Sequence, residues 1–302
     1  MQALFAFPSR GGAEGSMRRL IALLEASREP HCARIGRRTK KGGTVMTANP
    51  SGLPPLSVAV ITRDEEERLP ACLQSASFAD EVLVVDSGST DRTVEIARSA
   101  GARVLEEPWR GFSEQKQFAV DQCENDWVLV LDADERVPEE TAGAIREALG
   151  SRGDGEVSAF SFPRKNFLHG RWIRHCGWWP DRIVRLVDRR SGAFDGRAVH
   201  EQWLARGRVH ALGSPIEHYS FRSYSELVAK MELYSDLASR AFFEEGKTVG
   251  PLTPPLHALW MFLRTYFLEL GVLDGFDGFV ISLMNAGGSF FKYAKLRELE
   301  WN

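Results

Sequence analysis

The chain has few cysteines, and they are not grouped. No Cys-x-x-Cys pair and no cluster of cysteine and histidine at zinc-ligand spacing is present among its 302 residues. This scarcity argues against a disulfide framework and against a zinc module of ordinary spacing. Free thiols in a reducing, cytoplasmic environment are therefore expected for the four cysteines, Cys32, Cys72, Cys123 and Cys176.

Long hydrophobic runs are also missing. No uninterrupted apolar segment approaches the roughly 20 residues that a membrane-spanning helix needs. The apolar run 20–24 near the N-terminus is short and continues directly into Glu25, which is not typical of a signal peptide. The sequence therefore predicts a cytoplasmic protein without a spanning helix.

A glycine-rich phosphate loop is absent as well. The turn after the first predicted strand is Thr62-Arg63-Asp64-Glu65-Glu66, which is acidic, and the pattern GxxxxGK[ST] occurs nowhere. Dinucleotide-binding folds and P-loop nucleotidases need glycines there so that phosphates can approach the backbone. Both classes are disfavoured.

Neither sign of charge dominates, because the net charge is -3. Residues 1–53 hold nine of the 38 Lys and Arg residues but only three of the 41 acidic ones, so the remainder is mildly acidic. That balance argues against nucleic acid as a partner. The first 53 residues are predicted to form a disordered basic arm, and Met46 is an alternative start of the natural chain.

From Leu56 onward, apolar strands alternate with helical patterns. Strands are predicted over 56–61, 82–85, 103–105 and 127–131, with helical segments between them. Alternating β and α segments with continuously apolar strands indicate a parallel sheet covered on both faces. In such sheets the ligand lies outside the carboxyl ends of the strands.

Acidic residues collect at those strand ends. Asp86 follows the second strand and Asp132-Ala133-Asp134 follows the fourth. Two carboxylates at i and i+2 of an extended segment point to the same side, and they suit Mg²⁺ or Mn²⁺ arriving with a substrate's phosphates. The alternatives are a turn-forming aspartate for Asp86 and solvated loop acids or a helix cap for the pair.

Four segments carry a resemblance to a known family: VAVITRDEEERLPACLQSA, VLVVDSGSTDRTVEIARSAGARV, GFSEQKQFAV and DWVLVLDADERV. Together they resemble the family 2 inverting glycosyltransferases of the GT-A fold, closest to the branch that includes lipopolysaccharide-core glucosyltransferases. The likeness is dense over 56–137 and looser toward the C-terminus. It implies an α/β, Rossmann-like, mostly parallel sheet flanked by helices, with a helical C-terminal extension.

The resemblance also implies roles for individual residues. The nucleotide-sugar donor would be held by Thr62, Asp64, Glu65, Asp86, Lys116 and Asp132. Asp86 would bind the nucleobase, Lys116 would lie along the nucleotide, and Asp132 would contact the ribose or metal-bound water. Asp64 stands where the family more often has asparagine. For Asp64 and Glu65 the alternative is a helix N-terminus, which favours acids.

The metal and the catalytic base are implied in the same way. Asp134 would ligate Mg²⁺ or Mn²⁺, and His218 would complete the metal shell, although a lone histidine is more often structural. Glu201, within Val199-His200-Glu201, fits the base that takes the acceptor's proton. Asp181 is the second candidate for the base, and a surface acid is the alternative for Glu201.

The second half contains aromatic and basic residues suited to an acceptor. Trp172, Trp178 and Trp179 are predicted either to stack on sugar rings or to pack in the core. Four basic residues would meet an anionic acceptor or form a solvated basic face, namely Arg164, Lys165, Arg171 and Arg174.

Two apolar stretches follow near the C-terminus. Segment 256–270, interrupted by Arg264 and Glu269, is predicted to form one helix of about four turns after Pro254-Pro255, and 276–291 is the second stretch. They indicate either a helix lying in a membrane interface or a buried packing helix. Peripheral membrane contact through 252–302 is thus one expectation.

These observations predict three parts: a basic arm over 1–53, a catalytic domain over 54–225, and a helical region over 226–302. The catalytic domain divides into a nucleotide-binding half, 54–137, and an acceptor half, 138–225. The expected activity is transfer of a hexose from a nucleotide diphosphate sugar, UDP-hexose, to a saccharide or lipid-linked acceptor. It would serve lipopolysaccharide synthesis at the inner face of the cytoplasmic membrane.

Two other functions remain open from the sequence. One is a sugar-phosphate nucleotidyltransferase, which is disfavoured because no Gly/Arg-rich loop follows the first strand. The other is a protein that binds nucleotide sugars without catalysis.

Overall fold

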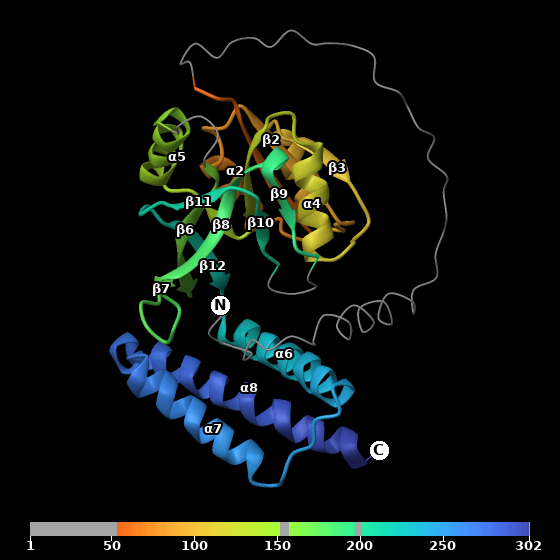
Figure 1. Cartoon of the computed structure of the whole chain (residues 1–302), viewed down its shortest axis with the longest axis vertical. Helices are drawn as coiled ribbons and strands as arrows, with labels where there is room; N and C mark the ends of the chain where they lie inside the picture. Colours follow the sequence, from red (N-terminus) through yellow and green to blue (C-terminus); the bar gives the residue numbers. More distant parts are fainter. Residues whose placement is uncertain (1–52, 152–156, 197–200, 302) are drawn as a thin grey trace.

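A computed structural model describes residues 53–151, 157–196 and 201–301, which form a ten-stranded sheet with flanking helices and a group of C-terminal helices (Figure 1). The predicted basic arm lies outside the described residues except for Leu53, and so do Cys32, Val199 and His200. The α/β class and the helical C-terminal extension expected of a GT-A fold are confirmed.

The first half of the sheet is parallel, as predicted. Its strands are β1 (Leu56–Thr62), β2 (Glu81–Asp86), β3 (Arg103–Glu106) and β4 (Trp127–Asp132), in the order β3-β2-β1-β4. In the register, Thr62 lies beside Asp86, and Ile61 lies beside Asp132. The carboxyl ends of three strands therefore meet at one edge of the sheet.

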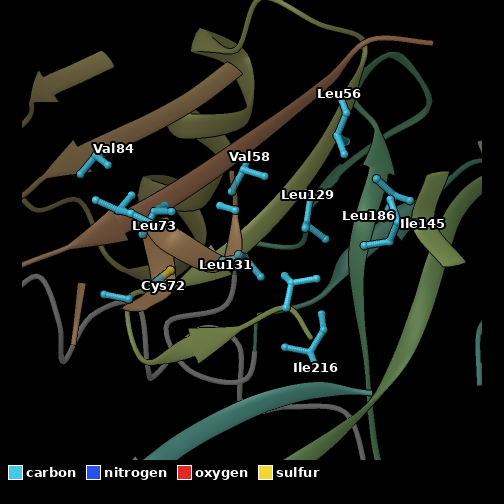
Figure 2. Packing of buried hydrophobic residues seen from close by; sticks show 14 of the residues in the cluster. Leu56, Val58, Cys72, Leu73, Val84, Leu129, Leu131, Ile145, Leu186 and Ile216 are labelled. Carbon is cyan, nitrogen blue, oxygen red and sulfur yellow. The ribbon is translucent and has the colours of Figure 1, made fainter. Parts of the chain in front are cut away.

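Helices cover both faces of this half because its strands are apolar on both sides. The flanking helices are α2 (Leu69–Ser75), α3 (Thr93–Ser99), α4 (Phe112–Gln122) and α5 (Glu139–Ser151). Alternate residues of each strand enter opposite clusters. Val58 and Leu129 pack in the cluster that holds side chains of α2, α3 and α5 (Figure 2). Ala59 and Val128 pack with side chains of α4.

The second half is mixed rather than parallel. Next to β4 come β8 (Asp181–Asp188), β6 (Val157–Leu168), β12 (Ile216–Phe221) and β5 (Glu135–Arg136). β8 runs antiparallel to both neighbours. In 157–221 the described strands are not joined by α-helices, and antiparallel neighbours do not need the long crossover that parallel strands require. Two short strands, β7 (Arg171–Trp172) and β11 (Arg208–Ala211), pair with β6 and complete the sheet. Strands β9 (Gly192–Phe194) and β10 (Trp203–Ala205) form a separate antiparallel pair, and the 3-10 turn η2 (Arg189–Ser191) precedes β9.

The pairing of β12 with β5 matters for the site. Strand β5 follows the Asp132-Ala133-Asp134 turn directly, and His218 of β12 lies opposite its first residue, Glu135. The backbone N–H of Tyr219 donates to the carbonyl of Asp134. A residue more than 80 positions downstream is thereby held beside the acidic pair.

The C-terminal region consists of α6 (Tyr224–Glu244), α7 (Thr253–Leu263), the π-helical turn η3 (Arg264–Leu268), the 3-10 turn η4 (Gly271–Asp274) and α8 (Gly275–Trp301). Helix α8 packs against both α6 and α7 (Figure 1). The helix predicted over 256–270 starts earlier, at Thr253, because prolines are tolerated in a first turn. Among the described helices, none is both long and apolar enough to cross a bilayer.

The three described cysteines, Cys72, Cys123 and Cys176, are buried free thiols, as predicted.

Candidate active site

A cavity of about 700 Å³ opens at the carboxyl edge of β1 and β4. Its walls come from both halves of the sheet and from α6. Seven of the residues predicted for the site line it: Thr62, Glu65, Lys116, Asp132, Asp134, Glu201 and His218. Three others, Asp64, Asp86 and Asp181, are not among its lining residues.

Asp132 is held by two cations on different elements. Its Oδ1 lies 2.7 Å from Nζ of Lys116 on α4, and its Oδ2 accepts a hydrogen bond of 2.6 Å from Arg185 on β8. Burial opposes ionisation of this carboxyl, but Lys116 and Arg185 outweigh it and hold the pKa of Asp132 below its ordinary value. Asp132 is therefore an ionised, fixed group in the cavity.

Lys116 also binds Glu201. The Lys116 side chain is only 1% exposed, and its Nζ donates a hydrogen bond of 2.7 Å to Oε1 of Glu201. One buried ammonium thus joins the end of β4 to the segment before β10. The sequence placed both residues at the site but did not predict that they touch.

Asp134 faces His218. Their closest atoms, Oδ2 and Nε2, lie 3.2 Å apart, and the other ring nitrogen of His218 lies 2.7 Å from Oδ1 of Asn166. Burial opposes ionisation of Asp134, but His218 outweighs it and lowers the pKa of the carboxyl. If the imidazole donates from Nδ1 to Asn166, its Nε2 either carries a second proton toward Asp134 or offers a lone pair to a cation.

That arrangement fits a divalent cation that takes part of its shell from elsewhere. The described residues contain no group of three or more His, Cys, Asp or Glu side chains placed to hold a metal. Asp134 and His218 supply an oxygen and a nitrogen donor. Mg²⁺ is usually held by one or two carboxylates, with substrate phosphates and water completing the shell.

Asp181 lies behind the cavity rather than in it. Arg164 donates two hydrogen bonds to its carboxylate, from Nη2 and from Nε, and the one from Nε is 3.0 Å long. Burial opposes ionisation, but Arg164 outweighs it and lowers the pKa of Asp181. A carboxylate engaged in this way positions Arg164, which does line the cavity. Of the two acids predicted as candidates for the base, Glu201 lines the cavity and Asp181 does not.

Glu135 completes a buried ionic layer beneath the cavity. Its carboxylate is fully buried and lies 2.7 Å from Arg185 and 3.4 Å from Arg164. It also accepts from the backbone N–H of Asp132. Glu135 was not singled out from the sequence, because an acid next to the Asp132-Ala133-Asp134 turn carries no separate signal of its own.

The other residues predicted to hold the nucleotide sugar fall into two groups, those that line the cavity and those that do not. Thr62 and Glu65 line the cavity, and the buried hydroxyl of Thr62 has no hydrogen-bond partner among the described residues. Burial raises the pKa of Glu65, and Arg68 opposes this effect.

Asp64 and Asp86 shape turns instead. Asp64, at φ 51°, accepts from the N–H of Thr90 at 2.7 Å, and Asp86 accepts from the N–H groups of Gly88 and Ser89, each at 2.9 Å. These hydrogen bonds support the turn-forming interpretation of Asp86. Its role toward a nucleobase stays a prediction.

The tryptophans proposed for sugar stacking lie away from the cavity lining. Trp178 is 1% exposed and packs on Phe221, and Trp172 contacts Trp179 edge to face. The core interpretation is the one that fits Trp178. Lys165 and Arg174 lie over the Trp172 ring rather than in the cavity.

Other aromatic residues line the cavity, and the sequence reasoning missed them. Trp109, in the connection from β3 to α4, and Phe112, the first residue of α4, lie edge to face with ring centres 4.8 Å apart. They remain 38% and 44% exposed. Their position just after the carboxyl end of a predicted strand was the available signal. Also missed were Arg182, Arg185, Trp203, Lys230 and Tyr234.

Comparison with known proteins shows the family to which this chain is similar. Residues 57–200 match the family model of Glycosyl transferase family 2. An uncharacterized glycosyltransferase from Rickettsia bellii is 32% identical over 255 residues, which cover 81% of this chain and 86% of that protein. The lipopolysaccharide core biosynthesis glycosyltransferase LpsC from Rhizobium meliloti is 32% identical over 258 residues, covering 80% and 92%.

Among solved structures, a mannosyltransferase from Pyrobaculum calidifontis in complex with GDP-mannose and Mn²⁺ has a TM-score of 0.48 at 16% identity, covering 85% of this chain and 91% of that one. The extent and identity of the match to the two curated glycosyltransferases decide the assignment: this chain belongs to glycosyl transferase family 2 and is a glycosyltransferase.

Proposed function

We propose that this glycosyltransferase is metal-dependent and inverting, and that it moves a hexose from UDP-hexose to a saccharide or lipid-linked acceptor of the cell envelope. The observation that carries the proposal is the placement of Asp134 with His218 and of Glu201 on one cavity. Lys116 joins Glu201 to Asp132, two residues before Asp134. A metal position and a separate carboxylate are the two groups that a metal-assisted single displacement needs.

Asp134 and His218 would hold Mg²⁺ or Mn²⁺ together with the donor's diphosphate. When bound, such an ion neutralises charge on the leaving diphosphate, an effect worth several kcal/mol. Asn166 fixes the ring of His218 for this task through its Oδ1, 2.7 Å from Nδ1.

Glu201 would act as the base. Its carboxylate lines the cavity and is oriented by the Lys116 ammonium at 2.7 Å. As the acceptor oxygen attacks the anomeric carbon, Glu201 takes its proton, which contributes roughly 10²–10⁴-fold to the rate. Attack from the face opposite the leaving group inverts the anomeric configuration.

A screen of nucleotide sugars with Mn²⁺ or Mg²⁺ tests the proposal, scored for nucleotide release and, by NMR, for the configuration of the product. We expect Glu201→Gln to lose transfer while it still binds UDP. Glu114→Gln, an exposed glutamate on α4, is the matched control and keeps full activity. Retention of configuration, or full activity of Glu201→Gln, would contradict the assignment.

Each of the two other functions predicts a different result. A nucleotidyltransferase would release pyrophosphate from a nucleoside triphosphate and a sugar phosphate. A non-catalytic binding protein would bind UDP and release no nucleotide from any donor.

The C-terminal helices support a lipid-linked acceptor. Residues 252–263 contain no Asp, Glu, Lys or Arg. Large apolar side chains are exposed along α7, the two turns and α8: Leu256, Leu259, Trp260, Phe267, Leu268, Leu273, Phe276 and Leu283. A mixed aliphatic and aromatic surface of this kind suits the boundary between headgroups and acyl chains. The similarity to the lipopolysaccharide core biosynthesis glycosyltransferase of Rhizobium meliloti supports such an acceptor.

Flotation of the full chain with phosphatidylethanolamine/phosphatidylglycerol vesicles tests this contact. We expect the wild type to float and the Trp260→Ser/Phe276→Ser variant to stay in the dense fractions. Leu233→Ser, an equally exposed leucine on α6, serves as control and floats. A wild type that never floats and sediments as a dimer through the same residues would show that a second copy covers this surface instead.

A further inference from the structure

Helix α6 lies beyond the residues that match the family model, yet it forms one wall of the cavity. Ser223 caps its N-terminus by accepting from the N–H of Glu226. Glu226 also pairs with Arg68, 3.2 Å away, next to the helix that follows β1. These contacts fix the first turn of α6 against the nucleotide half of the sheet. Lys230 and Tyr234 lie farther along the same helix, and both line the cavity.

Lys230 differs in its partners from the three buried cations that line the cavity. Lys116 is bound by two carboxylates, and so are Arg164 and Arg185. Lys230 forms no ion pair with a carboxylate among the described residues. Its ammonium lies instead over two aromatic rings, 5.1 Å from the centre of Phe221 and 5.8 Å from that of Tyr234. It is therefore a positive charge available to a ligand.

The strand that Lys230 borders shows which part of the cavity it lines. Its ammonium lies 5.1 Å from the ring centre of Phe221 on β12, the strand whose His218 lies 3.2 Å from Asp134. Lys230 therefore lines the cavity beside the strand that holds His218 against Asp134. In agreement with this position, burial lowers the pKa of Lys230, and Asp134 is the nearby charge that opposes this effect most. A diphosphate held at Asp134 and His218 would come within reach of a lysine on this wall, whose flexible stem suits a phosphate oxygen.

We propose that the Lys230 ammonium binds a non-bridging oxygen of the sugar-linked phosphate of the donor and stabilises the charge left when the sugar departs. This inference rests on the proposed function. In the step it serves, the bond between the acceptor oxygen and the anomeric carbon forms and the bond from that carbon to the phosphate oxygen breaks. The bonding electron pair stays on the diphosphate, and the acceptor's proton goes to Glu201. A fixed positive charge at that point acts where negative charge develops.

Binding of UDP and UMP to the purified full chain in Mn²⁺, measured by calorimetry, tests the contact without relying on turnover. Lys230→Met should weaken UDP binding about ten- to a hundredfold, as expected for the loss of a hydrogen bond to a charged group. The affinity for UMP, which lacks the distal phosphate, should change by less than about twofold. Lys230→Arg should restore most of the UDP affinity, because it returns the charge.

Arg240→Met is the matched control, since Arg240 lies on the same helix and pairs only within it, with Asp236 among the described residues. It should bind UDP as the wild type does. Unchanged UDP binding by Lys230→Met would overturn the proposal, and so would an equal loss of UDP and UMP. Normal UDP binding with a raised acceptor KM would also overturn it, and would place Lys230 at an anionic acceptor.

Nucleotide binding by the wild type and by Lys230→Met distinguishes failure of the proposed function from failure of the role of Lys230. If the wild type binds none of UDP, GDP and dTDP, the proposed function itself is wrong. If the wild type binds one of them and Lys230→Met binds it equally well, only the role of Lys230 is wrong. Should Lys230→Met fail to fold, the comparison of UDP with UMP is made with Lys230→Gln.

Discussion

Lys116 holds together two carboxylates of the cavity that come from different parts of the chain. Its buried ammonium contacts Asp132 and Glu201, each at 2.7 Å, and comes from a helix that neither acid belongs to. Both carboxylates would lose their shared partner without it. Buried charges left without a partner are costly, whereas exposed ion pairs contribute little.

Replacing Lys116 with methionine should therefore destabilise the fold by about 3–5 kcal/mol, as breaking a buried ion pair does. Arg240→Met, which breaks an exposed pair on α6, should change stability by less than about 0.5 kcal/mol. Urea unfolding monitored by circular dichroism measures both. Equal stability of the two variants would mean that the Lys116 network contributes nothing.

Asp181 gives a pH prediction of the same kind. Its pKa is lower in the folded chain than the ordinary 3.8, so its pairing with Arg164 stabilises the fold fully above that pH. The contribution is lost as the pH falls below 3.8 toward the folded-state pKa. Asp181→Asn should be less stable than the wild type at pH 7, with a difference that shrinks below pH 4. Thermal unfolding across pH 2.5–7 measures this, and a constant difference would contradict it.

At the scale of single elements, the sequence predicted the strands well and their partners poorly. Short, continuously apolar runs, such as the one ending at Asp132, form the buried strands of an α/β protein, so β1 to β4 were predictable. The meeting of Asp134 with His218 depends on the short antiparallel pairing of β12 with β5. No local pattern encodes that register, because a two-residue strand has no periodicity to detect.

The junction between η4 and α8 is another element that only the structure reveals. A Cβ atom added to Gly278 would lie 1.8 Å from the carbonyl oxygen of Gly271. Gly278→Ala should therefore destabilise the chain by about 1–3 kcal/mol or more through overpacking.

Gly287 on the same helix is the control for that substitution. Among the described residues, a Cβ atom at Gly287 would come near Met231 alone, at 3.9 Å. Gly287→Ala should be neutral or stabilise by up to about 1 kcal/mol, because alanine favours helices. Denaturant midpoints compare the two variants, and the contact between η4 and α8 would be in doubt if Gly278→Ala matched Gly287→Ala.

For the whole molecule, the cavity gathers side chains from Ile61 to Tyr234. The sequence could name Thr62, Lys116, Asp132, Asp134, Glu201 and His218, because strand ends and the family resemblance point to them. It could not decide whether the tryptophans pack in the core or stack on sugar rings, since aromatic side chains do both. Nor could it find Lys230, because a lysine on an amphipathic helix gives no sign of which face meets a cavity.

The most direct test of the account is calorimetric titration of UDP into the wild type and Asp134→Ala, with Mn²⁺ and with EDTA. The account predicts that Mn²⁺ strengthens UDP binding by the wild type and that this gain disappears in Asp134→Ala, while binding in EDTA is similar for both proteins. A gain from Mn²⁺ that survives in Asp134→Ala would contradict the assignment of Asp134 as the residue that holds the metal and the diphosphate.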